Sequence, residues 1–355
     1  ASDAYTRVSR SYGKAMIDAL RLRNKNIENV PDLVISPRNS AEIQQVITYC
    51  DAHLIPVYVY SAGSSVTRGI EAVKGGIALD MSHHMNRVLN FNETDQTITV
   101  EAGMTGPQLE DLLNHAPERL GASRAYTCGH FPQSFEYSSV GGWVVTRGAG
   151  QNSTYYGKIE DIVLAQEYAT PRGPFKTCPH PRSANGPDFD QLMMGSEGAF
   201  GVLTSVTLRV FRWQPENRVR YSYMFKNWDV AMQACREIMQ AEFGYPSVFR
   251  LSDPEETDVA MKLYHIEGTP ADTVLKMFGY QPMQKCLLLG HTDGEKTFSR
   301  NVNRQVRRIC RKYGAFNISF APVTKNWEKG RFRDPYMREE LEDFGVLIDT
   351  LECAV

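Results

Sequence analysis

The sequence predicts an α+β fold in two domains, and three observations lead to that class. Near the N-terminus, residues 33–37, 40–54 and 55–60 read as strand, helix and strand, which is the unit of an α/β layer. A second succession of strands and helices begins near residue 218. Between the two, residues 126–157 are predicted to form a long glycine-rich loop, because they have too few periodic apolar positions for ordinary secondary structure. A chain of 355 residues also favours two domains over one.

The first helices are predicted from apolar periodicity. Residues 5–23 are expected to form one amphipathic helix. The next helix begins at Ser40, which we expect to be its N-cap, and carries apolar side chains at the spacing i, i+3, i+4 and i+7, namely Ile43, Val46, Ile47 and Cys50.

Alternating apolar residues predict the strands of the first domain. The segments "RVLNFN" and "TITVEAG" are joined by four polar residues and are expected to pair as a β-hairpin. A helix is expected over 105–116, and further strands over 161–173 and 201–212. We place the end of the first domain at residue 212, and assign 213–355 to a second domain.

The second domain is predicted to be an α/β block. Its expected strands are 219–226, 246–253 and 285–294, and its expected helices are 227–243, 254–266 and 295–315. We interpret them as βαβ-like units that form a sheet with helices on one face.

Composition excludes several classes of function. The formal net charge is −2, so no global basic charge indicates nucleic acid as a partner. Seven cysteines are dispersed without paired spacing, which predicts free thiols and argues against a zinc site or a disulfide framework. The adjacent histidines in "SHHM" (82–85) have no third ligand at suitable spacing, so no metal site is expected.

The expected helix 295–315 has one strongly basic side. Val302, Val306, Ile309 and Cys310 lie on one side of the helix, and the arginines at 304, 307, 308 and 311 lie largely on the other. We favour a solvated helix face; contact with a lipid surface is the second interpretation.

Three tracts of small residues are candidate ligand sites. The turn 61–65 follows a strand and exposes consecutive backbone N–H groups, which can bind a phosphate; a tight turn without a ligand is the alternative. The tracts "SSVGGWVVTRGAG" (138–150) and "GSEGAFG" (195–201) are individually as consistent with turns and bulges. Together, and without a Walker lysine, they predict an extended dinucleotide along the first domain.

The order of these tracts, with "PDLVISP", "GHFPQSFEYSSVGGWVVTRGAG", "YGKIED" and "MMGSEGAFGVLTSVTLRV", resembles the FAD-binding domain of the vanillyl-alcohol-oxidase-type (PCMH-type) flavoproteins. Within that superfamily the chain most resembles the alkyldihydroxyacetonephosphate synthase (alkylglycerone-phosphate synthase) family, over nearly its whole length. The resemblance implies a two-subdomain FAD-binding domain over residues 1–212, followed by a partial cap domain.

The resemblance implies FAD as cofactor and assigns a set of residues to it. Ser61 and Ala62 stand where the family usually has glycines, and Gln133 stands where it generally has Asp. The expected FAD contacts are Val59, Tyr60, Ser61, Ala62, Gly63, Ser64, Ser65, Gln133, Ser134, Phe135, Glu136, Tyr137, Ser138, Ser139, Thr146, Arg147, Gly148, Ala149, Glu197, Gly198, Ala199, Phe200, Gly201, Val202 and Leu203.

The activity implied by the resemblance is exchange of the acyl group of acyl-dihydroxyacetone phosphate for a fatty alcohol, in ether-lipid synthesis, through an adduct at flavin N5. Arg250 in "PSVFRLSD" would be the catalytic arginine at the flavin, and Arg338 in "RFRDPYMREE" would bind the substrate phosphate. An FAD-linked 2-hydroxyacid or alcohol oxidoreductase on the same fold is the runner-up. A flavin-binding protein without catalysis is the third class.

The resemblance also carries expectations about completeness, partners and location. The family continues beyond the tract that corresponds to 349–352, into a region with a catalytic tyrosine and a histidine cluster, so we expect this chain to be incomplete. We expect lipid substrates, association with a membrane surface as an open alternative, a homodimer, and no nucleic acid. The expected compartment is the peroxisome or glycosome in a eukaryote and the cytoplasm in a bacterium, without secretion.

Overall fold

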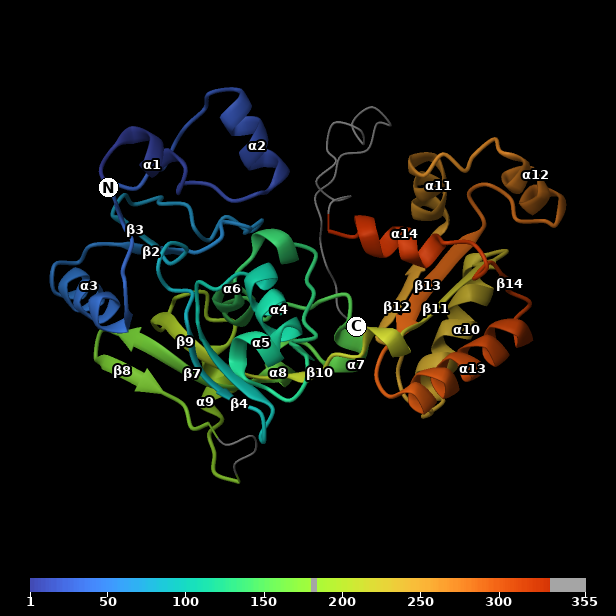
Figure 1. Ribbon diagram of the computed structural model, residues 1–355. Coiled ribbons are helices and arrows are strands. Elements are labelled where there is room, and N and C mark those ends of the chain that lie inside the picture. Colours follow the sequence, from blue (N-terminus) through green and yellow to red (C-terminus); the bar gives the residue numbers. More distant parts are fainter. Residues whose placement is uncertain (180–183, 333–355) are drawn as a thin grey trace. The chain divides into compact units, whose positions relative to one another are not determined.

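The computed structural model describes residues 1–179 and 184–332 of the chain (Figure 1). These residues form two compact units, each described here by itself. The first unit contains Ala1–Gly150, Gly157–Arg212 and Phe332; the second contains Gln151–Tyr156 and Trp213–Arg331. The segment Gln151–Tyr156 therefore belongs to the second unit, although the sequence placed it in the first domain.

The first unit begins with a parallel three-stranded sheet. Its strands β1 (Leu33–Ile35), β3 (Ile77–Asp80) and β2 (Val57–Tyr60) are ordered β1-β3-β2, and helix α3 (Ser40–Ala52) connects β1 to β2. The predicted strand–helix–strand unit is thus confirmed. The N-cap of α3 is Asn39 and not Ser40, because the extended Asn39 accepts a 2.9 Å hydrogen bond from the backbone N–H of Glu42.

The prediction of one N-terminal helix over 5–23 is wrong. The structure has two short helices, α1 (Ala4–Val8) and α2 (Met16–Arg23), separated at Gly13 and Lys14. Glycine is a poor helix former, and the backbone N–H of Lys14 donates to the carbonyl of Ser65 at 2.9 Å instead of to a helical partner.

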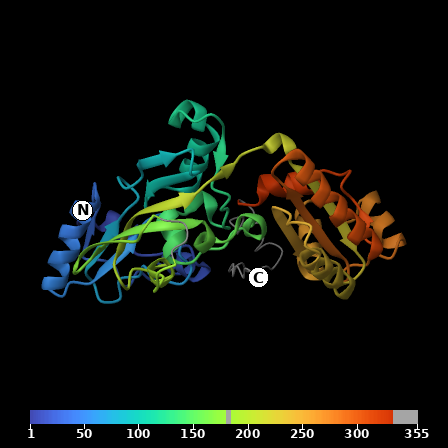
Figure 2. The same cartoon turned by 90° about the horizontal axis from the view of Figure 1, so that it is seen from below.

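The first unit also contains an antiparallel five-stranded sheet. Its order is β4-β5-β9-β7-β8, and the strands are β4 (Val88–Asn92), β5 (Thr97–Glu101), β7 (Val163–Thr170), β8 (Gly173–Lys176) and β9 (Val202–Arg209). The antiparallel pairing of β4 with β5 confirms the predicted hairpin. Figures 1 and 2 show α3 beside β7 and β8, with which it is in contact.

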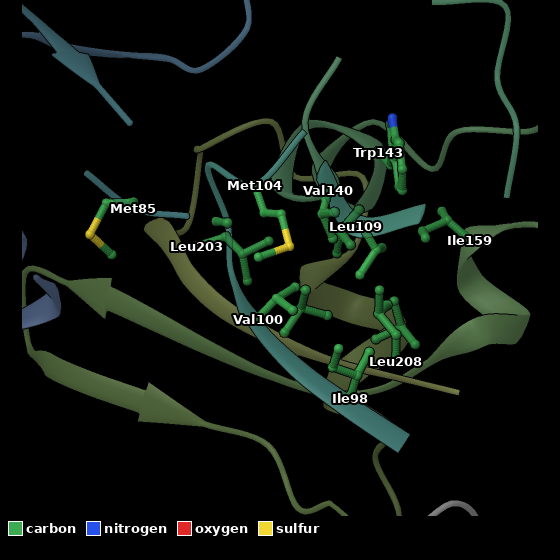
Figure 3. Close-up of a cluster of buried hydrophobic side chains, with 14 of the residues drawn as sticks. Met85, Ile98, Val100, Met104, Leu109, Val140, Trp143, Ile159, Leu203 and Leu208 are labelled. Atoms are coloured by element: carbon green, nitrogen blue, oxygen red, sulfur yellow. The ribbon is translucent and has the colours of Figure 1, made fainter. Parts of the chain in front are cut away.

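The core of the first unit lies between this sheet and helices that include α4 (Gly106–Asn114) and α6 (Val140–Val145). Figure 3 shows Ile98, Val100 and Leu208 from the strands near Leu109 and Val140 from the helices. All five side chains are fully buried. Burying a large aliphatic side chain contributes roughly 1.5–3 kcal/mol, so this layer holds the helices on the sheet.

The tract 126–157 is not the structureless loop that the sequence predicts. Besides α6 it contains β6 (Tyr126–Thr127), the 3-10 helix η1 (Phe135–Tyr137) and α7 (Ser153–Tyr156). Two glycines disfavour a helix at 140–145, but Ser139 caps it and the helix buries Val140, Trp143 and Val144. Tertiary packing therefore outweighs local propensity. The remaining elements of this unit are α5 (Ala116–Leu120), α8 (Ile159–Ile162), α9 (Phe189–Met193) and β10 (Phe211–Arg212).

The second unit contains a four-stranded sheet of order β12-β13-β11-β14. Its strands are β11 (Val219–Phe225), β12 (Val248–Ser252), β13 (Cys286–Thr292) and β14 (Phe316–Asn317), and its helices include α10 (Trp228–Gln240), α11 (Pro254–Leu263), α12 (Pro270–Met277), α13 (Lys296–Lys312) and α14 (Val323–Gly330). All three described ladders are antiparallel, so the prediction of βαβ-like units is wrong.

Helices cover both faces of this second sheet. Alternate side chains of β11, such as Tyr221 and Tyr223, pack with α10 and α13 in one hydrophobic core. His291 of β13 points to the other face, because it contacts Glu328 of α14. The prediction of helices on one face only is therefore wrong.

Six cysteines lie among the described residues and all are free thiols, as predicted; Cys353 lies outside them. Within residues 1–179 and 184–332, no helix is both long and apolar enough to cross a membrane.

Candidate cofactor site

A cavity of about 1020 Å³ lies in the first unit, and all three small-residue tracts line it. The turn 61–65 leaves the carboxyl end of the parallel strand β2. The second tract forms α6 and the residues after it, and the third enters strand β9. The fold thus brings three tracts that are far apart in the sequence to one cavity.

Most residues that the resemblance assigns to FAD line this cavity. The residues that do not are Tyr60, Phe135, Glu136 and Tyr137. Tyr60 ends β2, and the other three form η1, in which Phe135 is buried. The individual FAD contacts stay predictions, because the lining describes the cavity and not the bound cofactor.

The geometry of the turn 61–65 lets a ligand come close to the backbone. Gly63 has a φ of +68°, and a Cβ at this position would stand 2.0 Å from the hydroxyl of Tyr60. The Oγ of Ser61 is buried and has no hydrogen-bond partner in the described part of the chain. Ser61 and Ala62 both line the cavity. A polar hydroxyl left unsatisfied beside a glycine turn fits a bound phosphate group.

Arg147 connects the second and third tracts. Its Nε donates to the carbonyl of Met194 at 3.1 Å, and its guanidinium also donates to the carbonyl of Gln191. A Cβ on Gly195 would stand 3.0 Å from the Arg147 side chain. We therefore assign Arg147 a role in holding the two tracts together at the cavity.

The cavity also contains residues that the sequence did not assign to the cofactor. Trp143 lies within the second tract, so the tract itself was the signal for it. Lys14 and Lys158 carry no local signal, because a single lysine in an ordinary sequence context does not indicate a ligand.

His130 packs against Trp143, which lines the cavity, and its imidazole is uncharged. Its imidazole is fully buried, with its ring centroid 4.9 Å from a ring centroid of Trp143. Burial lowers the pKa of His130 to about 3, so the ring is neutral at any physiological pH.

The lining as a whole fits FAD. Ser61, Ser64, Ser65, Ser139 and Thr146 supply hydroxyl groups, and the glycines let a ligand approach the backbone. Val59, Trp143 and Val145 supply apolar surface for a flat ring system. The volume lies at the upper end of the range for ligand cavities, as an extended dinucleotide requires.

The predicted catalytic and substrate residues belong to other parts of the chain. Arg250 lies on β12 in the second unit, half-exposed, and its guanidinium forms an ion pair with Glu256. Arg338 lies outside the described residues. The roles given to both arginines stay predictions.

Two protein families match the chain. The FAD binding domain family matches residues 31–179, and the C-terminal domain family of FAD linked oxidases matches residues 214–355. Among curated proteins, the chain is 28% identical to alkyldihydroxyacetonephosphate synthase of Dictyostelium discoideum over 99% of this chain and 58% of that protein. It is 32% identical to the Caenorhabditis elegans synthase over 72% of this chain and 42% of that protein.

Solved structures agree with these matches. An alkyldihydroxyacetonephosphate synthase structure superposes with a TM-score of 0.84 at 26% identity, over 97% of this chain and 62% of that chain. The match bears out the α+β fold class. The chain spans about half the length of the curated synthases that it matches.

Proposed function

Because the chain belongs to the flavoprotein family of FAD-linked oxidases and alkyldihydroxyacetonephosphate synthases, we propose that it acts as an FAD-dependent alkyldihydroxyacetonephosphate synthase. The reaction would exchange the acyl group of acyl-dihydroxyacetone phosphate for a fatty alcohol. The observation that carries the proposal is the cavity of about 1020 Å³, in which three glycine-rich tracts converge.

The cofactor would supply the electron-accepting chemistry, and the chain's own residues would bind and orient. When bound, FAD supplies an electron sink for the substrate carbon. The turn with Gly63 and the hydroxyls beside it would hold the pyrophosphate, and Val59 and Trp143 would flank the ring systems. Arg250 would orient the substrate, and Arg338 would bind its phosphate through two parallel hydrogen bonds.

The proposal is tested by incubating the FAD-loaded protein anaerobically with acyl-dihydroxyacetone phosphate and a radiolabelled fatty alcohol. We expect release of the fatty acid and incorporation of the label into an ether, with no net reduction of the flavin at the end of the reaction. Label that stays in the alcohol, with no fatty acid released, would contradict the proposal. Since the chain spans about half of its relatives, the same assay is run on the complete gene product if the chain continues beyond residue 355.

A second candidate reaction has a specific observation behind it. Over 83% of its length the chain is 26% identical to glycolate oxidase subunit GlcD of Bacillus subtilis. A separate anaerobic sample of the FAD-loaded protein is therefore mixed with a 2-hydroxyacid. Persistent flavin reduction by the hydroxyacid alone would favour an oxidoreductase over the synthase, and no response to either substrate would favour a flavin-binding protein without catalysis.

The proposal also covers association and location. Arg300, Arg304, Arg307, Arg308 and Arg311 of α13 have no ion-pair partner within the described ranges, and we retain the solvated-face interpretation of these side chains. Co-sedimentation with anionic phosphatidylglycerol vesicles would instead support contact with a lipid surface. We propose a homodimer, which light scattering checks. We also propose residence in the peroxisome or glycosome of a eukaryote or in the cytoplasm of a bacterium, which imaging of the tagged protein checks.

A further inference from the structure

The N-terminal segment, residues 1–30, precedes the matched FAD binding domain, which begins at residue 31. Nothing in that match gives the segment a role toward the cofactor. Nevertheless Lys14 lines the cavity, together with the turn 61–65 and the glycine-rich tracts. We propose that Lys14 is a ligand of the FAD pyrophosphate, and that the N-terminal segment forms one wall of the cofactor site.

The backbone at Gly13 and Lys14 is in direct contact with the phosphate-binding turn. The N–H of Lys14 donates to the carbonyl of Ser65 at 2.9 Å. A Cβ on Gly13 would stand 2.0 Å from the same carbonyl oxygen, so only glycine allows this approach. Lys14 is therefore fixed next to the last residue of the turn whose N–H groups and hydroxyls face the cavity.

The side chain of Lys14 is oriented as well. Its ammonium lies 5.0 Å from the ring centroid of Tyr137, at the distance of a cation–π contact. Tyr137 belongs to η1, beside the second tract, and Ser138, which follows it, lines the cavity. The ring thus holds the cation between two segments that line the cavity.

Two ion pairs fasten the segment on either side of Lys14. Arg10 forms a 2.7 Å pair with Asp80, the last residue of β3. Arg21 forms a 2.8 Å pair with Glu71, and both of these side chains are largely buried. A segment held at residues 10, 14 and 21 keeps its lysine in place without a bound ligand.

A bound FAD would bring negative charge next to the turn 61–65. FAD carries two negative charges on its pyrophosphate, and the turn 61–65 offers only neutral donors. Lys14, Arg147 and Lys158 are the cationic side chains of the lining, and the backbone of Lys14 is bonded to the last residue of the turn. A charge-assisted hydrogen bond from Lys14 would balance the pyrophosphate charge that these neutral donors leave.

The test compares FAD binding by the apo-protein and its variants in equilibrium titrations that follow flavin fluorescence. We expect Lys14→Met to raise the Kd for FAD about 10- to 100-fold, as loss of a hydrogen bond between charged groups does. Lys74→Met is the matched control: it removes an exposed lysine of the same unit that does not line the cavity, and its Kd should stay within about twofold of the wild type.

Two further measurements separate a phosphate contact from general damage. Riboflavin, which lacks the phosphates, should bind the wild type and Lys14→Met alike, and Lys14→Arg should keep most of the FAD affinity. The salt dependence of the FAD Kd should be weaker in Lys14→Met, because a screened charge pair is missing. An unchanged FAD Kd in Lys14→Met would overturn the inference, and so would an equal loss of riboflavin binding. The inference rests only on the cofactor, so it stands or falls independently of which substrate reacts.

Discussion

At the scale of single residues, Gly63 is the position on which the cofactor turn depends most directly. Its φ of +68° disfavours any side chain, and an added Cβ would stand 2.0 Å from the Tyr60 hydroxyl. We expect Gly63→Ala to lower the free energy of unfolding by about 1–2 kcal/mol and to weaken FAD binding at least tenfold. A titration of the apo-protein with FAD measures the second effect.

The control for this substitution is Gly121→Ala. Gly121 has the same φ of +68°, but nothing lies within 4 Å of its added Cβ. Gly121→Ala therefore introduces backbone strain without changing the turn that lines the cavity. The FAD affinity of this variant should equal that of the wild type. If both variants lost FAD equally, the effect would come from lowered stability and not from the turn.

Glu71 gives the chain a stability that depends on pH. Burial alone would raise its pKa, but hydrogen bonds from Arg21, Asn29 and Arg68 lower the pKa of Glu71 to about 2, from an ordinary value of 4.5. The folded state thus favours the carboxylate, and this contribution, roughly 3 kcal/mol, is complete above pH 4.5 and is lost as the pH falls toward 2.

We therefore expect Glu71→Gln to be less stable than the wild type at pH 7 and to lose less stability between pH 7 and pH 3.5. Urea unfolding at the two pH values measures both differences. Glu118→Gln, which changes an exposed side chain of α5, should leave the pH dependence intact. An identical acid-induced loss in Glu71→Gln and wild type would show that Glu71 does not contribute.

At the scale of elements, one acidic side chain of α14 contributes ion pairs to the second sheet, beside the hydrogen bond that the Thr324 hydroxyl donates to the carbonyl of Tyr221. Glu328 of α14 contacts His291 at 2.7 Å and Arg220 at 2.8 Å, and these partners lower the pKa of Glu328 to about 2 despite its burial. Glu328→Gln should destabilise the second unit by about 2 kcal/mol, because Arg220 and the buried His291 both lose the carboxylate that they contact.

Hydrogen exchange locates this effect. The backbone amides of α14 should exchange faster in Glu328→Gln, while those of α10, on the opposite face of the sheet, should keep their protection. Glu267→Gln serves as the control, since Glu267 is exposed and lies outside α14. Uniform acceleration in both helices would mean that the whole unit, and not the attachment of α14, is affected.

Local elements could be predicted from the sequence, and elements fixed by distant contacts could not. The β4–β5 hairpin and the α3 unit follow from periodicity within short segments. The break at Gly13 also depends on the contact with Ser65, and the helix α6 depends on burial of Trp143, so the local signals at Gly13 and Ser139 did not suffice to predict them. The three glycine-rich tracts predicted most of the cavity lining because each is continuous in the sequence. The sequence did not predict Lys14 as a lining residue, because only the fold brings it to the turn 61–65.

At the scale of the whole molecule, the two units have separate hydrophobic cores. The core of the first unit includes Ile98, Val140 and Leu208, and the core of the second includes Tyr221 and Val306. Every residue that lines the cofactor cavity belongs to the first unit. A ligand stabilises the part of a protein that binds it, so FAD should act on the two units unequally.

We expect thermal unfolding to show two transitions. FAD should raise the midpoint temperature of only one of them, the unfolding of the first unit. At an FAD concentration 100 times the Kd, the first unit gains about 2.7 kcal/mol, and release of the flavin, followed by its fluorescence, should coincide with the raised transition. Tryptophan emission reports mainly the second unit, because three of the four tryptophans, at 213, 228 and 327, belong to it. The tryptophan transition should therefore stay within about 1 °C of its value in the apo-protein. If both signals moved together by the same amount, the two units would unfold as one cooperative body, and stabilisation by FAD would extend beyond the unit that contains its site.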